Sequence, residues 1–309
     1  MIDGLMGFAI GDAMGVPTEF CMRDKLMEHP ITSMIGFGSH EMPAGTWSDD
    51  TSMTLATMDA IISDEDIILK TIMENFLIWV NEAKYTASDV VFDIGRTVLR
   101  ALKTYSDLEC NPEDAGGKDE MDNGNGSLMR MLPIAYYTFY RKSSERKLIE
   151  TISSVSSLTH GHEISILGCY LYVKFTHYLL AGLDKFEAYE NLKKLNLSKF
   201  GKDSVNRYSR ILENNIHELS LRDISSSAFV VDTLESVFWI LFNTDNFKHA
   251  IIGAINMGND TDTIGAIVGS LAGIYYGYSS IPYCWINKLI RSGNIIDMAK
   301  KFDNVVKEQ

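Results

Sequence analysis

The sequence predicts an all-α protein that folds as a single domain over residues 1–309. Apolar side chains recur every three or four residues through most of the chain, for example at Leu69, Ile72, Met73 and Phe76, which is the spacing of one helix face. Hardly any segment alternates apolar and polar residues with period two, as a half-buried strand would. No linker or internal repeat divides the chain, so one helical core is expected.

The N-terminal segment predicts a helix that packs closely against another. Within residues 4–16, glycine recurs every three or four residues among apolar neighbours, at Gly4, Gly7, Gly11 and Gly15. This spacing leaves a bare stripe on one helix face, which suits close backbone packing. Residues 17–47 are rich in glycine and proline and predict a long functional loop.

The rest of the chain reads as helices in series. Helices are expected at residues 51–62, 69–80, 89–105, 127–139, 145–158, 163–181, 185–195, 203–219, 234–241, 246–257, 263–276 and 284–302. Residues 107–122 hold seven acidic side chains and are interrupted by proline and glycine. They predict a solvated surface loop, with a partner or substrate role as the open alternative.

Composition excludes several classes of protein. The chain carries 41 acidic and 28 basic residues, a net charge of −13, so binding to nucleic acid through its phosphates, sequence-specific or not, and to anionic membranes is not expected. Its four cysteines form no Cys-x-x-Cys pair and are expected to be reduced. The sequence contains no recognisable signal peptide or membrane-spanning segment, so a cytoplasmic protein is expected. The sequence does not predict an oligomeric state.

Two short clusters of carboxylates and hydroxyls, at residues 48–51 and 260–263, each open a helix-like segment. Free N–H groups and the positive end of the helix dipole favour ionised carboxylates there. If the clusters meet, each like-charged pair near 4 Å costs about 4 kcal/mol at an effective dielectric near 20, and a hard cation would remove that cost. An ordinary helix cap is the alternative for each cluster alone. An EF-hand is excluded, because the twelfth residue from Asp260 is Leu271 rather than glutamate.

A glycine-rich turn supplies a candidate anion site. It reads Asn123-Gly124-Asn125-Gly126-Ser127, where glycines permit close backbone approach and a following helix would present free N–H groups. A plain tight turn is the alternative. No Gly-x-Gly-x-x-Gly segment follows a strand, so a Rossmann nucleotide site is not supported.

Taken in series, these motifs resemble the ADP-ribosylglycohydrolase family. The resemblance covers nearly the whole chain in the expected order, and the matching segments are residues 11–15 with Glu19, then 45–51, 92–95, 123–130, 159–160, 231–234 and 258–265. It implies an all-helical, roughly orthogonal bundle and a site for two divalent ions, Mg²⁺ or Mn²⁺.

The resemblance also implies roles for individual residues. The implied metal ligands are Ser48, Asp49, Asp50, Asp260, Asp262 and Thr263, and Asp49 and Asp262 are counted with the catalytic residues. Functional carboxylates are implied at Glu19 and Asp93, one as acid and one as base, with a surface or capping role as the alternative for each. His160 and the turn Asn123, Gly124, Asn125, Gly126 and Ser127 are expected to bind the substrate, whereas His162 is expected to begin a helix.

The function expected from this resemblance is metal-dependent hydrolysis of the glycosidic bond between ADP-ribose and a modified acceptor. The acceptor could be a protein arginine or serine, a nucleic-acid base or a small conjugate, since the fold and the metal site serve only the shared half of the substrate. Hydrolysis of O-acetyl-ADP-ribose is an alternative within the enzymes. A non-catalytic ADP-ribose-binding or structural protein is the alternative outside them.

Overall fold

The computed structural model describes residues 1–307 as α-helices joined by loops and short 3₁₀ turns, and the described part contains isolated β-bridges but no strand. This confirms the all-α prediction. The helices are α1 (Ile2–Gly15), α2 (Arg23–Glu28), α3 (Asp49–Asp64), α4 (Leu69–Glu82), α5 (Arg96–Leu108), α6 (Leu132–Tyr140), α7 (Glu145–Ser157), α8 (Glu163–Leu180), α9 (Lys185–Lys193), α10 (Lys202–Arg207), α11 (Ser209–Leu212), α12 (Val230–Phe242), α13 (Phe247–Ile255), α14 (Thr261–Tyr276), α15 (Tyr283–Lys288) and α16 (Ser292–Lys307).

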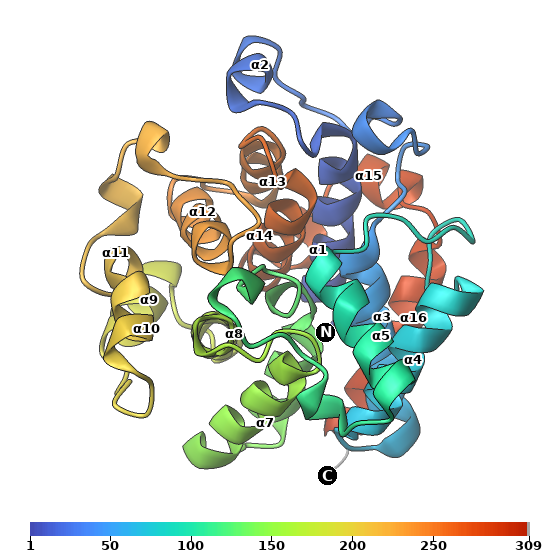
Figure 1. Ribbon diagram of the computed structural model, residues 1–309. Coiled ribbons are helices and arrows are strands. Elements are labelled where there is room, and N and C mark those ends of the chain that lie inside the picture. Colours follow the sequence, from blue (N-terminus) through green and yellow to red (C-terminus); the bar gives the residue numbers. More distant parts are fainter. Residues whose placement is uncertain (308–309) are drawn as a thin grey trace.

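Helices α1 and α14 lie side by side at the centre of the molecule, with the other helices arranged around them (Figure 1). Their residues are almost all buried, so both helices pack against the protein on every side, and their few buried polar residues include Asp12 and Asp262. Glycines let the two backbones touch: a methyl group on Gly7 would lie 2.1 Å from the carbonyl oxygen of Gly269. The glycine stripe therefore packs as its spacing predicts.

The core around this pair is continuous through most of the bundle, and a second apolar cluster lies between α3, α4 and α5. Phe76 and Trp79 of α4 are fully buried in that second cluster. None of the described helices is both long and apolar enough to cross a bilayer. The four cysteines are all unpaired thiols.

Three predicted helices are wrong in their extent, each for a local reason. Helix α5 begins at Arg96 rather than near residue 89, because Asp89 and Asp93 adopt positive φ angles of 59° and 61° that a helix does not allow. The segment 127–139 begins as a 3₁₀ turn, and α6 starts only at Leu132, which places Pro133 in the first turn where its missing N–H costs nothing. The segment 284–302 is divided at Arg291, whose φ is 57°.

Two further segments differ from the sequence prediction. Residues 203–219 form the short helices α10 and α11 and a 3₁₀ turn, and the buried Tyr208 at the junction donates a hydrogen bond to the carbonyl of Ile164, 2.8 Å away. The long loop 17–47 is confirmed in the main but contains the helix α2.

Candidate functional site

The first half of the site is the N-terminus of α3, which is held against α1 by Asp12. One carboxylate oxygen of Asp12 accepts a hydrogen bond from the backbone N–H of Ser48 at 2.9 Å. Its other oxygen accepts from the N–H of Thr51 at 3.0 Å and from the hydroxyl of Thr51 at 2.6 Å. Asp12 therefore accepts hydrogen bonds from N–H groups at the start of α3 that would otherwise lack an acceptor.

The second half of the site is the N-terminus of α14, which follows a strained turn. Gly258 and Asn259 have φ angles of 78° and 59°, and this turn delivers Asp260 to the start of the helix. The turn is fixed to the segment after Glu19, because Phe20 N–H donates to the Asn259 carbonyl at 2.6 Å. Thr261 donates its hydroxyl hydrogen to the Gly15 carbonyl of α1 at 2.9 Å, which ties this helix start to α1 as well.

The two predicted clusters meet. The hydroxyl groups of Ser48 and Thr263, one from each cluster, donate to the same oxygen of Asp50, at 3.1 and 3.2 Å. One oxygen each from Asp12, Asp50 and Asp262 lie within 4.8 Å of one another, and the same holds for Glu19, Asp260 and Asp262.

Several of these buried carboxylate oxygens have no hydrogen-bond partner. They are one oxygen of Asp50 and both oxygens of Asp262, although both residues are only 1% exposed. Burial, reinforced by the neighbouring carboxylates, raises the pKa of Asp50 and of Asp262 well above the usual range. Unpaired buried carboxylates are costly, and an all-oxygen donor set without cysteine fits a hard divalent cation.

Glu19 and Asp93 lie beside this cluster, together with a histidine that the sequence analysis did not select. His40 Nε2 is hydrogen-bonded to a carboxylate oxygen of Glu19 and lies 3.9 Å from Asp93. Burial and the charges of Asp262 and Asp260 raise the pKa of Glu19 to about 11. Burial, Asp49 and Glu19 likewise raise the pKa of Asp93 to about 9. Burial and the neighbouring carboxylates therefore favour the protonated form of both carboxyl groups when no cation is near.

A narrow cleft of about 260 Å³ opens over these groups; we call it the carboxylate cleft. Its polar lining comes from Glu19, Asp49, Asp93, Arg96, Thr97, Asn125, His160, Asp260 and Thr263, and Gly124 and Gly126 also line it. Ser48, Asp50 and Asp262 do not line the cleft and lie beneath its floor.

The glycine-rich turn contributes to the carboxylate cleft only in part. Asn125 donates hydrogen bonds to Asp260 and, at 2.9 Å, to the hydroxyl of Thr233. The side chains of Asn123 and Ser127 point elsewhere: Asn123 accepts two hydrogen bonds from Ser165 at the start of α8, and Ser127 lies in the core. The structure thus brings Gly124, Asn125, Gly126 and His160 to the cleft, and not Asn123 or Ser127.

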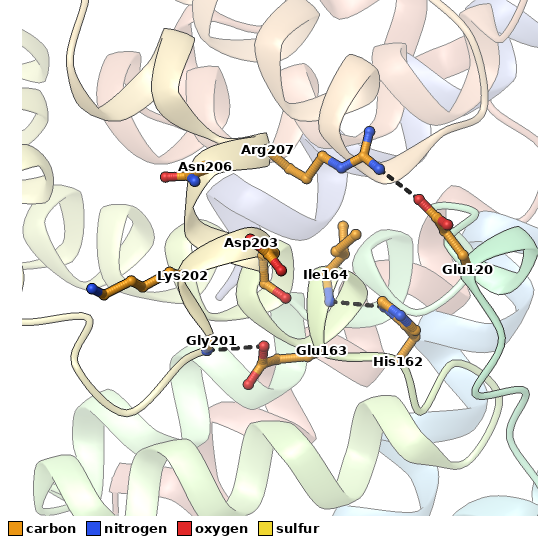
Figure 2. A pocket seen from close by; sticks show the side chains of 10 residues that line it. Glu120, His162, Glu163, Ile164, Gly201, Lys202, Asp203, Asn206 and Arg207 are labelled. Carbon is orange, nitrogen blue, oxygen red and sulfur yellow. Dashed lines mark hydrogen bonds and ion pairs between the residues drawn. The ribbon is translucent and has the colours of Figure 1, made fainter.

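A second cavity, of about 720 Å³, lies between the start of α8 and α10 and is shown in Figure 2. His162 caps α8 there by accepting the Ile164 N–H at 3.2 Å, which confirms its expected place at a helix start. Arg207 pairs with Glu120, and Glu163 accepts the Gly201 N–H at 3.0 Å. The side chains of this second cavity thus have hydrogen-bond or ion-pair partners within the protein, whereas oxygens of Asp50 and Asp262 beneath the carboxylate cleft have none. We therefore place the candidate site at the carboxylate cleft, the smaller of the two cavities.

Asp12 and His40 are the residues that sequence reasoning did not assign to the site. Asp12 lies inside the glycine stripe of α1, where a buried carboxylate among apolar residues is itself a signal. His40 lies in a loop without periodicity, and its place beside Glu19 depends on tertiary contacts such as the ring packing against Phe92, with centroids 5.2 Å apart.

The fold and the site together define an all-α protein whose buried carboxylates gather at two helix N-termini below a narrow cleft. A family model for ADP-ribosylglycohydrolase matches residues 1–309, and the chain belongs to this family.

Relatives agree with this assignment. The chain is 32% identical over 308 residues to ADP-ribosylarginine hydrolase Tri1 of Serratia proteamaculans, covering 99% of this chain and 79% of that protein. It is 33% identical over 298 residues to the protein of the same name from Pseudomonas putida, covering 96% and 76%. It is 28% identical over 290 residues to the ADP-ribosyl dinitrogen reductase glycohydrolase of Rhodospirillum rubrum, covering 93% and 89%. A solved structure described as an ADP-ribosylglycohydrolase-related protein complex superposes with a TM-score of 0.83 at 25% identity, over 99% of this chain and 97% of that one.

Proposed function

We propose that this protein is a metal-dependent hydrolase that releases ADP-ribose from modified arginine side chains. The observation that carries the proposal is the set of unpartnered, buried oxygens of Asp50 and Asp262 below the carboxylate cleft. A folded protein leaves such groups unpaired at high cost unless a ligand satisfies them.

In this proposal two divalent ions, Mg²⁺ or Mn²⁺, are held by Ser48, Asp49, Asp50, Asp260, Asp262 and Thr263. Such ions would supply positive charge that polarises substrate oxygens and lowers the pKa of water. Asn125 supports the ligand set by donating to Asp260, and Asp12 supports it by holding the start of α3. This arrangement follows the usual logic of metal sites, in which neighbours orient the ligands.

Glu19 and Asp93 carry the proton transfers in the proposed reaction. Both line the carboxylate cleft, and cleavage at an anomeric carbon requires one group that takes a proton from water and one that gives a proton to the departing nitrogen. The negative charges of Asp260 and Asp262 contribute to raising the pKa of Glu19 to about 11. A cation bound to these two carboxylates would offset their charge and lower the pKa of Glu19.

Arginine is the proposed acceptor because two relatives that are 32% and 33% identical over nearly the whole chain are ADP-ribosylarginine hydrolases. An ADP-ribosylhydrolase of another name, ARH3 of Danio rerio, is 25% identical over 91% of the chain. Similarity over the shared half of the substrate does not select an acceptor, so this part of the proposal needs its own test.

The test is release of free ADP-ribose from a panel of four substrates, each with Mg²⁺, Mn²⁺ or EDTA. The panel consists of an ADP-ribosyl-arginine peptide, an ADP-ribosyl-serine peptide, ADP-ribosylated nucleic acid and O-acetyl-ADP-ribose. We expect release from the arginine peptide with metal and none with EDTA. Release only from another substrate would overturn the acceptor, release in EDTA would overturn the metal, and binding of ADP-ribose without any release would identify a non-catalytic relative.

A further inference from the structure

A buried arginine lies behind the carboxylate cleft without a carboxylate partner. Arg130 is fully buried, and its Nε and Nη1 atoms have no hydrogen-bond partner within residues 1–307. Its Nη2 group donates to the carbonyl of Val155 at 3.0 Å and to the hydroxyl of Thr159 at 2.8 Å, and the guanidinium carbon lies 5.1 Å from the ring centre of Phe76. A buried cation without a counter-ion is costly to keep, which suggests that its contacts serve another purpose.

Thr159 connects this arginine to His160. The Thr159 hydroxyl oxygen lies 2.8 Å from Nδ1 of His160, and Thr159 is fully buried. Arginine can only donate hydrogen bonds, so the hydroxyl accepts from Arg130 and must place its own single hydrogen elsewhere. Within the described residues the hydroxyl has one further hydrogen-bond partner, Nδ1 of His160.

The His160 ring carries one proton, because burial and the charge of Arg130 lower its pKa to about 3. If that proton were on Nδ1, two N–H groups would point at the Thr159 oxygen, and the buried hydroxyl hydrogen would have no acceptor. If the proton is on Nε2, the Thr159 hydroxyl accepts from Nη2 of Arg130 and donates to Nδ1 of His160, so that both the hydroxyl and Nδ1 are satisfied.

The Nε2 side of the ring faces the carboxylate cleft. His160 lines that cleft, and its Nε2 atom has no hydrogen-bond partner within residues 1–307. The two glycines of the turn leave it uncovered: a methyl group on Gly126 would lie 2.8 Å from the Cε1 atom of His160, and one on Gly124 would lie 3.5 Å from Nε2.

We infer that Arg130 and Thr159 are positioning residues that hold His160 as its Nε2–H tautomer, so that a neutral ring donates a hydrogen bond to an oxygen of the substrate in the carboxylate cleft. The tautomer follows from contacts within the protein alone, whereas the nature of the oxygen, a phosphate or ribose oxygen of ADP-ribose, rests on the proposed function.

Nitrogen NMR of the full chain labelled with ¹⁵N-histidine measures the tautomer directly. Long-range proton–nitrogen correlations distinguish a protonated ring nitrogen from an unprotonated one, and His160→Gln identifies the His160 signals by their loss. We expect a proton on Nε2 in the unmodified protein and in Thr159→Ser, which keeps the hydroxyl. In Thr159→Val we expect a shift toward the Nδ1–H form, and free ADP-ribose should move the Nε2 signal of the unmodified protein.

Kinetics with the ADP-ribosyl-arginine peptide provide the second readout. Loss of one correctly oriented hydrogen bond should raise KM by about 2- to 10-fold in Thr159→Val with a smaller change in kcat, and Thr159→Ser should restore it. The matched control is Thr138→Val, which removes another threonine hydroxyl bonded to a histidine, His177, at 3.0 Å and away from the cleft. It should leave KM and kcat unchanged.

A proton on Nδ1 of His160 in the unmodified protein would overturn the inference, and this measurement does not depend on whether any variant folds. An unchanged tautomer and KM in Thr159→Val would overturn it as well. If no substrate is hydrolysed, the proposed function fails while the NMR result still decides the role of Arg130 and Thr159.

Discussion

Gly11 of α1 and Gly265 of α14 are in direct backbone contact: a methyl group placed on Gly11 would lie 1.8 Å from the Gly265 carbonyl oxygen. No side-chain rearrangement can relieve such an overlap, because both sides of the contact are backbone. Asp12 directly follows Gly11, and Asp262 lies three residues before Gly265. The contact between the two glycines therefore also fixes the separation between Asp12 and Asp262. Helix packing and site geometry are therefore one structural feature.

Substitution of Gly265 by alanine should destabilise the protein by at least the 1–3 kcal/mol that is typical of overpacking, because the two helices must move apart. Chemical denaturation measures the loss. Gly293→Ala is the matched control: nothing lies within 4 Å of the added methyl group, so its stability should stay equal or rise by about 0.4–1 kcal/mol. Equal stability of both variants would contradict the close contact.

Asp12→Asn should destabilise the protein by roughly 2–3 kcal/mol and also abolish metal binding. Both Asp12 oxygens accept hydrogen bonds from α3, so the NH₂ group of asparagine would face donors instead of acceptors. Thr51→Val removes only one of these bonds and should cost about 1 kcal/mol. Thermal unfolding in EDTA ranks the two variants, and a smaller loss for Asp12→Asn would refute its role as an anchor.

Asp262→Asn should have the opposite effect on the stability of the metal-free protein. No backbone or hydroxyl group donates to the oxygens of Asp262, and its neighbours Asp93, Asp260 and Asp12 are themselves carboxyl groups. Removal of its charge should therefore leave the metal-free protein as stable as before or more stable. The increase in Tm that Mg²⁺ or Mn²⁺ gives the unmodified protein, corresponding to about 2.7 kcal/mol at 100 times Kd, should disappear. ADP-ribose release should fall by more than about 100-fold. Turnover at the unmodified rate would exclude Asp262 from the site.

Glu19→Gln and Asp93→Asn should each lower kcat by about 10²- to 10⁴-fold while they keep the metal-dependent increase in Tm. Both residues line the carboxylate cleft, as do the proposed ligands Asp49, Asp260 and Thr263, whereas Ser48, Asp50 and Asp262 do not. Parallel measurements of turnover and of Tm with and without Mg²⁺ separate the two roles. A variant that loses turnover and metal stabilisation together would be a ligand rather than a proton-transfer group.

The pH dependence of stability should contain a contribution from His177. Burial lowers its pKa to about 4, and its Nε2 lies 3.0 Å from the Ala135 carbonyl. Between pH 6.5 and about 4 the unfolded chain binds a proton at this residue and the folded chain does not, so this contribution to stability decreases as the pH falls. The free energy of unfolding of the unmodified protein relative to His177→Gln should therefore fall by up to about 1.4 kcal/mol per pH unit in that window. A constant difference would show that His177 titrates normally.

The sequence predicted the features that depend on local spacing. The glycine stripe of α1 and the two clusters that begin α3 and α14 are readable because each is a repeat or a cap within a few residues. The positions that were missed depend on contacts between distant segments. Asp12 bonds a residue 36 positions away and His40 one 21 positions away, and no periodicity records such pairs. Asp93 was selected by motif, but the positive φ that sets it in a loop before α5 was not predictable from its residue type.

The pairing of α1 with α14 also has a consequence for synthesis in the cell. Thr261 bonds the carbonyl of Gly15 across 246 positions of sequence, so α1 has no central partner until most of the chain has left the ribosome. At typical translation rates this delay is roughly 10–50 s. During that time an apolar helix with a bare glycine face is exposed, which makes the nascent chain a substrate for chaperones and the closure of α1 on α14 a late step of folding.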